Sequence, residues 1–288
     1  MIKALLVAAL AAVALPAAAA TSIPSGKWSF AFTDAKGRGA EAPMRVYTYR
    51  PKKCDEKCPL QFVLHGLNRN ASSYRDYWEV AADNYGLVIV APEFDKVHWK
   101  GQEGYNLGNV ENADREKWSY SVIEHLFDEV RDGRTEYRIF GHSAGGQFVH
   151  RMMFFLPNNR AAMVVAANPG WYMMPEWRKD RPVDAYPYSF VGAKVGEPEL
   201  RKALERRFAL MVGEKDTDPN AKNLDNAEGA KKQGAGRLER GENFFKAATA
   251  AAKDLGVKMN WEFMEIPDTA HSGSKMSKYA ADVIYGKK

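Results

Sequence analysis

The sequence is poor in cysteine and has no apolar run of bilayer length. Two of its 288 residues are cysteines, too few for a disulfide-dense scaffold. After residue 20, charges interrupt every hydrophobic run within the length of a strand, so we expect no later segment to insert stably into a membrane. Internal repeats, low-complexity tracts and linkers rich in proline or serine are also missing. These absences favour a single domain over residues 21–288.

Several binding signatures are missing as well. The chain has 41 basic and 36 acidic residues, interleaved as at 201–207, so nucleic-acid binding is not expected. No phosphate-cradling glycine loop, dinucleotide fingerprint or cluster of metal ligands occurs. We therefore expect no cofactor and no metal, while the oligomeric state stays open.

The N-terminus has the three parts of a secretory signal peptide. A basic start at Lys3 precedes an apolar run at 4–15 and small residues that end at Ala20. The run is shorter than the roughly 20 residues that a bilayer requires, and no stop-transfer charges follow it. We predict a signal peptide over residues 1–20 and a soluble product that is secreted or periplasmic.

Cys54 and Cys58 lie just before a predicted strand. In the oxidising compartment that export implies, we expect them to form a disulfide that pins a short loop. Half of a metal site is the alternative, but no second cysteine pair is present to complete it.

Strand-like and helix-like segments alternate along the chain. Buried-type or alternating runs predict strands at 28–32, 44–49, 60–64, 87–91, 137–140, 163–167, 208–212 and 259–266. Helical periodicity predicts helices at 73–84, 114–130, 147–156, 198–206, 242–255 and 275–284. We expect an antiparallel opening pair, then an α/β fold with a mainly parallel central sheet covered by helices on both faces. Ligands bind such sheets at the carboxyl ends of the strands.

A nucleophile motif follows the strand predicted at 137–140. Gly141-His142-Ser143-Ala144-Gly145 runs from this strand into a helix. A serine on a strained strand-to-helix turn needs nearly side-chain-free residues two before and two after it. Gly141 and Gly145 meet that demand, so Ser143 is the candidate nucleophile. An ordinary glycine-rich turn is the structural alternative.

A serine hydroxyl needs a base, and the base needs an acid to orient it. Of the six histidines, only His271 lies in a loop directly after the last predicted strand, the expected position for the base. His142 is expected to point away from the hydroxyl, and His65 ends a strand.

Asp216, three residues after the strand-ending Gly213, is our choice for the acid. Asp218 is the competitor, because either carboxylate of this loop could reach the imidazole. Glu214 is closer to the strand and is expected to be a turn residue.

These motifs, with Leu64-His65-Gly66-Leu67 upstream, resemble an α/β-hydrolase, and the chain is similar to secreted esterases related to polyhydroxybutyrate depolymerases. The resemblance implies an oxyanion hole formed by the backbone N–H groups of Leu67 and Ala144. The chain departs from the lipase pattern because it has no His-Gly-Gly-Gly run. His65 is expected to make structural hydrogen bonds.

Two loops at the catalytic end are rich in aromatic residues. We expect Trp99 and Tyr105 of one loop, with Trp171 and Tyr172 of the other, to line a cleft for an acyl chain, an aromatic acid or a polyester segment. Packing of these rings on the core is the alternative.

The sequence therefore predicts an exported serine hydrolase that cleaves small or polymeric carboxylic esters through an acyl-enzyme. A peptidase or amidase similar to prolyl oligopeptidases is the second hypothesis. A non-catalytic binding protein on a hydrolase scaffold is the third, since fold does not fix function.

Overall fold

The computed structural model describes residues 21–180 and 184–286, so the predicted signal peptide lies outside the described residues. One sheet contains eight strands in the order β1-β2-β4-β3-β5-β6-β7-β8. The strands are β1 Gly26–Asp34, β2 Gly39–Arg50, β3 Leu60–Leu64, β4 Val88–Glu93, β5 Tyr137–His142, β6 Ala161–Ala167, β7 Phe208–Gly213 and β8 Trp261–Ile266. β1, β2 and β4 pair antiparallel, and all other neighbours are parallel. This confirms the predicted α/β fold and its antiparallel opening pair.

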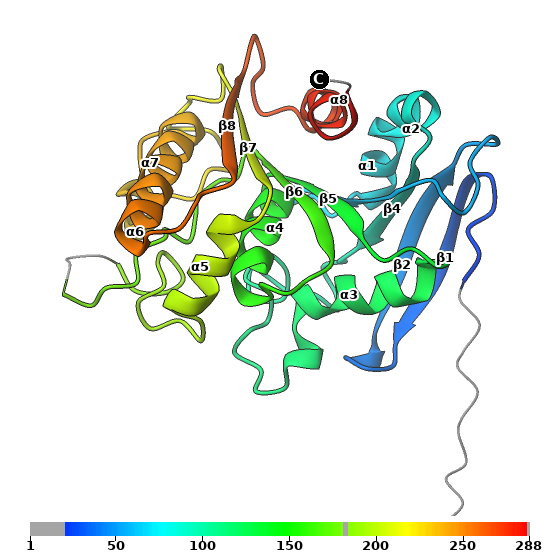
Figure 1. Ribbon diagram of the computed structural model, residues 1–288, viewed down its shortest axis with the longest axis horizontal. Coiled ribbons are helices and arrows are strands. Elements are labelled where there is room, and N and C mark those ends of the chain that lie inside the picture. Colours follow the sequence, from blue (N-terminus) through cyan, green and yellow to red (C-terminus); the bar gives the residue numbers. More distant parts are fainter. Residues whose placement is uncertain (1–20, 181–183, 287–288) are drawn as a thin grey trace, which may run out of the picture.

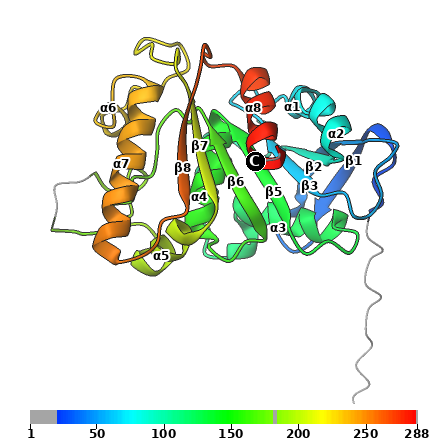
Figure 2. The same ribbon diagram turned by 45° about the horizontal axis from the view of Figure 1, so that its top comes forward.

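Helices cover both faces of the sheet (Figure 1). One face carries α1 (Ala71–Tyr77), α2 (Glu79–Tyr85) and α8 (Gly273–Tyr285). The other face carries α3 (Ser119–Val130), α4 (Ala144–Phe155), α5 (Glu197–Glu205) and α7 (Arg237–Leu255). The short helices η1 (Arg115–Lys117) and α6 (Glu228–Lys231) lie in connecting segments. In Figure 2, α8 lies in front of the sheet and α4 behind it.

The two helix layers enclose two hydrophobic clusters, one on each face of the sheet. Successive strand residues point to opposite faces, so Phe62 packs in the cluster with Phe148 of α4. Val63, the next residue, packs with Trp78 and with Met276 of α8. All five residues of β3 are buried, which explains why four of them are apolar, while the fifth, Gln61, bonds the Phe62 carbonyl and the Tyr285 hydroxyl.

Two predicted helices differ from the observed ones. The helix expected at 73–84 is divided into α1 and α2 at Trp78, which caps both helices and is fully buried, with its indole against Phe140 of β5. α7 begins at Arg237, five residues earlier than expected. Arg237 and Arg240 occupy this added turn and are buried.

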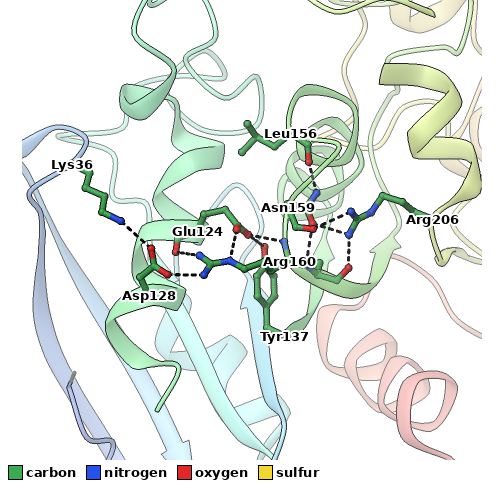
Figure 3. Close-up of polar contacts among 9 residues, drawn as sticks. Lys36, Glu124, Asp128, Tyr137, Leu156, Asn159, Arg160 and Arg206 are labelled. Atoms are coloured by element: carbon green, nitrogen blue, oxygen red, sulfur yellow. Dashed lines mark hydrogen bonds and ion pairs between the residues drawn. The ribbon is translucent and has the colours of Figure 1, made fainter. Parts of the chain in front are cut away.

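A polar network closes the amino-terminal edge of the parallel strands (Figure 3). Arg160, just before β6, pairs with Glu124 at 2.8 Å and with Asp128 at 2.6 Å, both on α3. The Tyr137 hydroxyl at the start of β5 also donates to Glu124. The Arg206 guanidinium donates to the Asn159 side chain at 2.9 Å. These contacts hold α3 to the strands at the edge opposite Ser143.

Cys54 and Cys58 form the predicted disulfide before β3. The bridge closes a loop of four residues' separation, so it constrains the chain only locally.

A second polar cluster joins β1 to α3. His125 is buried on α3, with Nδ1 within 2.9 Å of both Asp34 carboxylate oxygens and Nε2 at 2.8 Å from Glu116 Oε2. Carboxylate oxygens only accept hydrogen bonds, so both contacts are made when the imidazole carries two protons. Burial lowers the pKa of His125, but the hydrogen bonds to Asp34 and Glu116 outweigh it, and the pKa is raised above its usual value.

This cluster predicts a pH-dependent contribution to stability. Because the folded-state pKa of His125 is raised, its contribution is complete below the unfolded-state value and is lost as pH rises through the folded-state value. The wild type should therefore have a larger free energy of unfolding than the His125→Leu variant, and this difference should be greater at pH about 6 than at pH about 9. Urea unfolding of both proteins at the two pH values measures this difference. An equal gap at both pH values would contradict the charged state of His125.

Candidate active site

Ser143 occupies a strained turn between β5 and α4. Its backbone has φ 57° and ψ −116°, and a positive φ is uncommon for a residue with a side chain. The Ser143 N–H donates to the Ala167 carbonyl at 2.9 Å, while its carbonyl accepts from the Gln147 N–H at 3.0 Å. The turn is thus fixed between β6 and the first turn of α4.

The flanking glycines are required by close backbone contacts. A Cβ at Gly141 would lie 2.1 Å from the Gly145 carbonyl oxygen. One at Gly145 would lie 2.4 Å from the Leu64 carbonyl oxygen. Because the neighbouring atoms are backbone, neither clash can be relieved by a rotamer change. The motif spacing is therefore steric, as expected for a nucleophile elbow.

The structure brings together the three side chains selected for the triad. His271, in the loop between β8 and α8, has Nε2 at 3.0 Å from Ser143 Oγ. Its Nδ1 lies 2.7 Å from Asp216 Oδ2. Since a carboxylate cannot donate, Nδ1 carries the proton and Nε2 is free to accept from the serine hydroxyl. Asp216, in the loop after β7, is buried.

The other two carboxylates of that loop lie elsewhere. Asp218 is exposed and accepts a hydrogen bond from the Asn220 N–H at 2.8 Å. Glu214 accepts from the Asp268 N–H at 3.0 Å, so it joins the two late loops as a turn residue. Of the three candidates, Asp216 is the one in contact with His271.

Leu67 and Ala144 both adjoin Ser143. Ala144 is the first residue of α4, and a Cβ added at Gly66 would lie 3.5 Å from Ser143 Cβ. Within residues 21–180 and 184–286, the N–H groups of Leu67 and Ala144 donate to no backbone carbonyl. They remain the predicted oxyanion donors.

His65 makes structural hydrogen bonds. Its Nε2 accepts from the Phe94 N–H at 3.1 Å, which leaves the proton on Nδ1 to bond the Gly66 carbonyl at 3.0 Å. Burial lowers the pKa of His65 to about 3, so the ring is neutral. It joins the Gly66 turn to the loop after β4.

His142 contacts the candidate base, His271. The sequence did not predict this contact. Its ring centroid lies 4.7 Å from that of His271, and its Nδ1 lies 2.7 Å from the Tyr74 hydroxyl. Burial lowers the pKa of His142 well below its usual value, so the ring is neutral. No motif connects Tyr74 to the elbow, and the packing of α1 against β3, β4 and α8 brings the two together.

Two cavities of about 250 Å³ each meet at Ser143 and share Leu67 and Asn223. The first cavity is further lined by Gly66, Asn68, Asn70, Tyr74, Tyr77, His142, His271 and Gly273. The second is further lined by Gln102, Asn106, Ala144, Gln147, Trp171, Lys222, Leu224 and Asp225. A substrate with a part on each side of its reacting carbonyl fits this arrangement.

Of the four predicted aromatic contacts, Trp171 alone lines one of these cavities. Trp99, Tyr105 and Tyr172 are buried in the core instead. Tyr105 stacks against the neutral His65 ring at 4.8 Å and donates to the His65 carbonyl, while Tyr172 stacks on Phe244 at 4.5 Å. The expected aromatic wall is therefore corrected to Trp171 beside amide side chains, because the other rings pack the loops onto the core.

Arg237 is a further missed residue, because its position at the start of α7 carried no sequence motif. Its Nη1 lies 3.2 Å from Asp216 Oδ1, so the candidate acid has a cation on one side and an imidazole on the other. Among the described residues, no group of three or more His, Cys, Asp or Glu side chains is arranged to hold a metal ion.

No protein-family model matches the sequence. A search of curated proteins also finds no match. Solved structures do match. Poly(aspartic acid) hydrolase-1 from Sphingomonas sp. KT-1 is 36% identical, with a TM-score of 0.85 over 91% of this chain and 100% of that one.

LpqC, a poly(3-hydroxybutyrate) depolymerase from Bordetella parapertussis, is 31% identical, with a TM-score of 0.84 over 91% of this chain and 90% of that one. An S-formylglutathione hydrolase from Agrobacterium tumefaciens shares the fold at 18% identity and a TM-score of 0.54. By its fold and its similarity to the first two proteins over nearly all of its length, the chain belongs to the α/β-hydrolases that resemble poly(3-hydroxybutyrate) depolymerases.

Proposed function

We propose that this hydrolase cleaves carboxylic esters through an acyl-enzyme on Ser143. The observation that carries the proposal is the continuous hydrogen-bond chain from Ser143 through His271 to Asp216. Ser143 Oγ attacks the ester carbonyl while His271 Nε2 takes its proton, and Asp216 stabilises the resulting imidazolium. The N–H groups of Leu67 and Ala144 donate to the oxyanion of the tetrahedral intermediate.

The second half of the reaction repeats these roles with water. His271 gives its proton to the departing alcohol, the Ser143 ester remains, and a water molecule then loses a proton to His271 as it attacks. His271 then returns that proton to Ser143 Oγ as the carboxylic acid leaves, which restores the serine hydroxyl. Atoms and charges balance with water as the only co-substrate.

The proposed substrates are small or polymeric esters whose acyl and alcohol parts occupy the two cavities. The shared position of Ser143 between the cavities supports this, as does the similarity to a poly(3-hydroxybutyrate) depolymerase. Trp171 lines the second cavity beside Gln147, whose side-chain oxygen accepts from the Asn106 amide at 2.7 Å. Groups that combine apolar surface with a few polar atoms suit such a lining.

Hydrolysis of an amide is the second candidate. The neighbour at 36% identity is a poly(aspartic acid) hydrolase, and poly(aspartic acid) is a polyamide. The same triad can cleave both kinds of bond, but an amine leaves only after it has received a proton from His271. Rates on an ester and an amide with the same acyl group separate the two candidates.

We further propose that residues 21–288 are one exported domain and that residues 1–20 are a signal peptide. The Cys54–Cys58 disulfide supports an oxidising compartment. Among the described residues, no helix combines the length and apolar character that crossing a membrane requires. N-terminal sequencing of protein recovered from the periplasm or medium should read from Thr21; an intact Met1 there would refute cleavage.

Ser143→Ala should lower kcat on short-chain p-nitrophenyl esters by roughly 10⁴-fold or more, because it removes the covalent route. The fold should persist, since an alanine side chain is smaller than serine and α4 begins at the next residue. Initial rates with matched circular dichroism spectra make the measurement. Wild-type turnover in a folded Ser143→Ala protein would refute the proposal.

The loop after β7 offers a matched pair of variants. Asp216→Asn should lower kcat by roughly 10⁴-fold, since the amide favours the wrong tautomer of His271. Asp218→Asn, two residues away and exposed, should retain nearly full kcat. The reverse order would move the acid to Asp218.

A further inference from the structure

A single buried guanidinium contacts both the candidate acid and the wall of the substrate cavities. Arg237 Nη1 lies 3.2 Å from Asp216 Oδ1, on the carboxylate oxygen that His271 does not use. Arg237 Nη2 donates to the backbone and side-chain oxygens of Asn223, each at 3.0 Å. The two terminal nitrogens therefore have separate partners. One serves the triad, and the other serves the loop.

Asn223 is the residue through which this contact reaches substrate. It lines both cavities that meet at Ser143, and its neighbours Lys222, Leu224 and Asp225 line the second. Leu224 is buried, and Asp225 accepts from Gln102 at 3.3 Å. The segment 222–225 is thus a fixed wall over the reacting serine, and Arg237 is one of its anchors.

The backbone holds Arg237 in this position. It is the first residue of α7, and the N–H of the next residue, Leu238, donates to the Asp216 carbonyl at 3.2 Å. A Cβ at Gly236 would lie 2.5 Å from the Thr217 carbonyl oxygen, so the start of α7 is packed directly on the acid loop. Arg237 is 1% exposed, and water therefore screens its charge weakly.

We infer that Arg237 is a positioning residue with two separable effects: it fixes the Asp216 carboxylate behind His271, and it holds Asn223 as a wall of the substrate cavities. This inference rests on the proposed function of the triad. A bidentate guanidinium can do both at once, whereas the single ammonium of lysine can reach only one partner well.

The first effect is electrostatic. Without the cation, the buried Asp216 carboxylate has His271 as its remaining charged partner, so the protonated imidazole is favoured. His271 then acts as a base only at higher pH. The acidic limb of the kcat/KM profile should move upward by on the order of one pH unit.

Other titratable and charged groups also lie near Asp216 and His271. His142 faces His271 and stays neutral, because burial lowers its pKa well below its usual value. Tyr172 lies near Asp216 and stays protonated, because burial raises its pKa. On the outer side of the late loops, Lys215 pairs with Asp268, and Lys275 of α8 contacts the Asp268 carbonyl at 3.4 Å.

Arg240 provides the matched control. It lies one turn further along α7 and is equally buried, at 1% exposed. Its guanidinium donates to the Gly234 carbonyl at 2.9 Å and to the Gly170 carbonyl at 2.7 Å, not to Asp216. Loss of a buried arginine from this helix is thus common to both sites, while contact with the acid is not.

The test compares Arg237→Met, Arg237→Lys and Arg240→Met by kcat and KM over pH, with active sites counted by fluorophosphonate titration. Arg237→Met should shift the acidic limb upward, lower kcat/KM about tenfold on that limb and raise KM. Arg237→Lys should return the acidic limb of the profile to its wild-type pH. Its KM should stay raised, because the lysine ammonium does not also hold Asn223. Arg240→Met should keep the wild-type acidic limb, because Arg240 does not contact Asp216.

A wild-type limb in folded Arg237→Met would overturn the electrostatic effect, and a wild-type KM in Arg237→Lys would overturn the anchoring effect. Histidine NMR titration of the wild type and Arg237→Met gives a readout that needs no substrate. If Ser143→Ala retains activity while the His271 resonance still moves with Arg237→Met, the proposed function fails and the placement of Arg237 stands. An unmoved resonance refutes the placement itself.

Discussion

The steric constraint at Ser143 determines how the rest of the site is built. β5 and α4 are separated by one residue, whose positive φ turns the chain from the sheet into the helix. The turn is possible because Gly141 and Gly145 have no side chains, so that their backbones can approach neighbouring backbone atoms at distances that would exclude a Cβ. The turn places the Ser143 hydroxyl at the carboxyl edge of the sheet, beside the first N–H groups of α4. All other parts of the site are placed relative to this point.

The parallel sheet supplies the partners because its strands end at the same edge. β7 and β8 are neighbours in register, so the loops that follow them bring Asp216 and His271 together. β3, beside β5, delivers Gly66 and Leu67 to the other side of Ser143. Buried polar groups then fix these loops: neutral His65 and His142 hold the turns, and the Arg237 cation sits behind the acid. The opposite edge is closed by Arg160, far from the chemistry.

Sequence patterns predicted the strands well because their apolar runs are buried on both faces, as in β3 and β7. Ser143, Asp216 and His271 were predicted for a related reason: each lies in the segment that follows a strand of the parallel sheet, and these segments meet at one edge. The sequence did not predict the break at Trp78 or the early start of α7. Both involve residues that tertiary packing buries, one tryptophan and two arginines, and no local sequence pattern indicates that burial. The contacts of Tyr74 and Arg237 depend on tertiary packing alone. For Trp99, Tyr105 and Tyr172, composition could not distinguish a cavity wall from a core.

The most direct test of the central claim, that Ser143 is an activated nucleophile, is covalent labelling followed by peptide mapping. The folded protein is treated with a fluorophosphonate, and the adduct is located by tandem mass spectrometry. The account predicts one adduct, on Ser143, which does not form in the denatured protein because activation requires His271 at 3.0 Å. An adduct on another residue, or a folded protein that stays unlabelled, would contradict it.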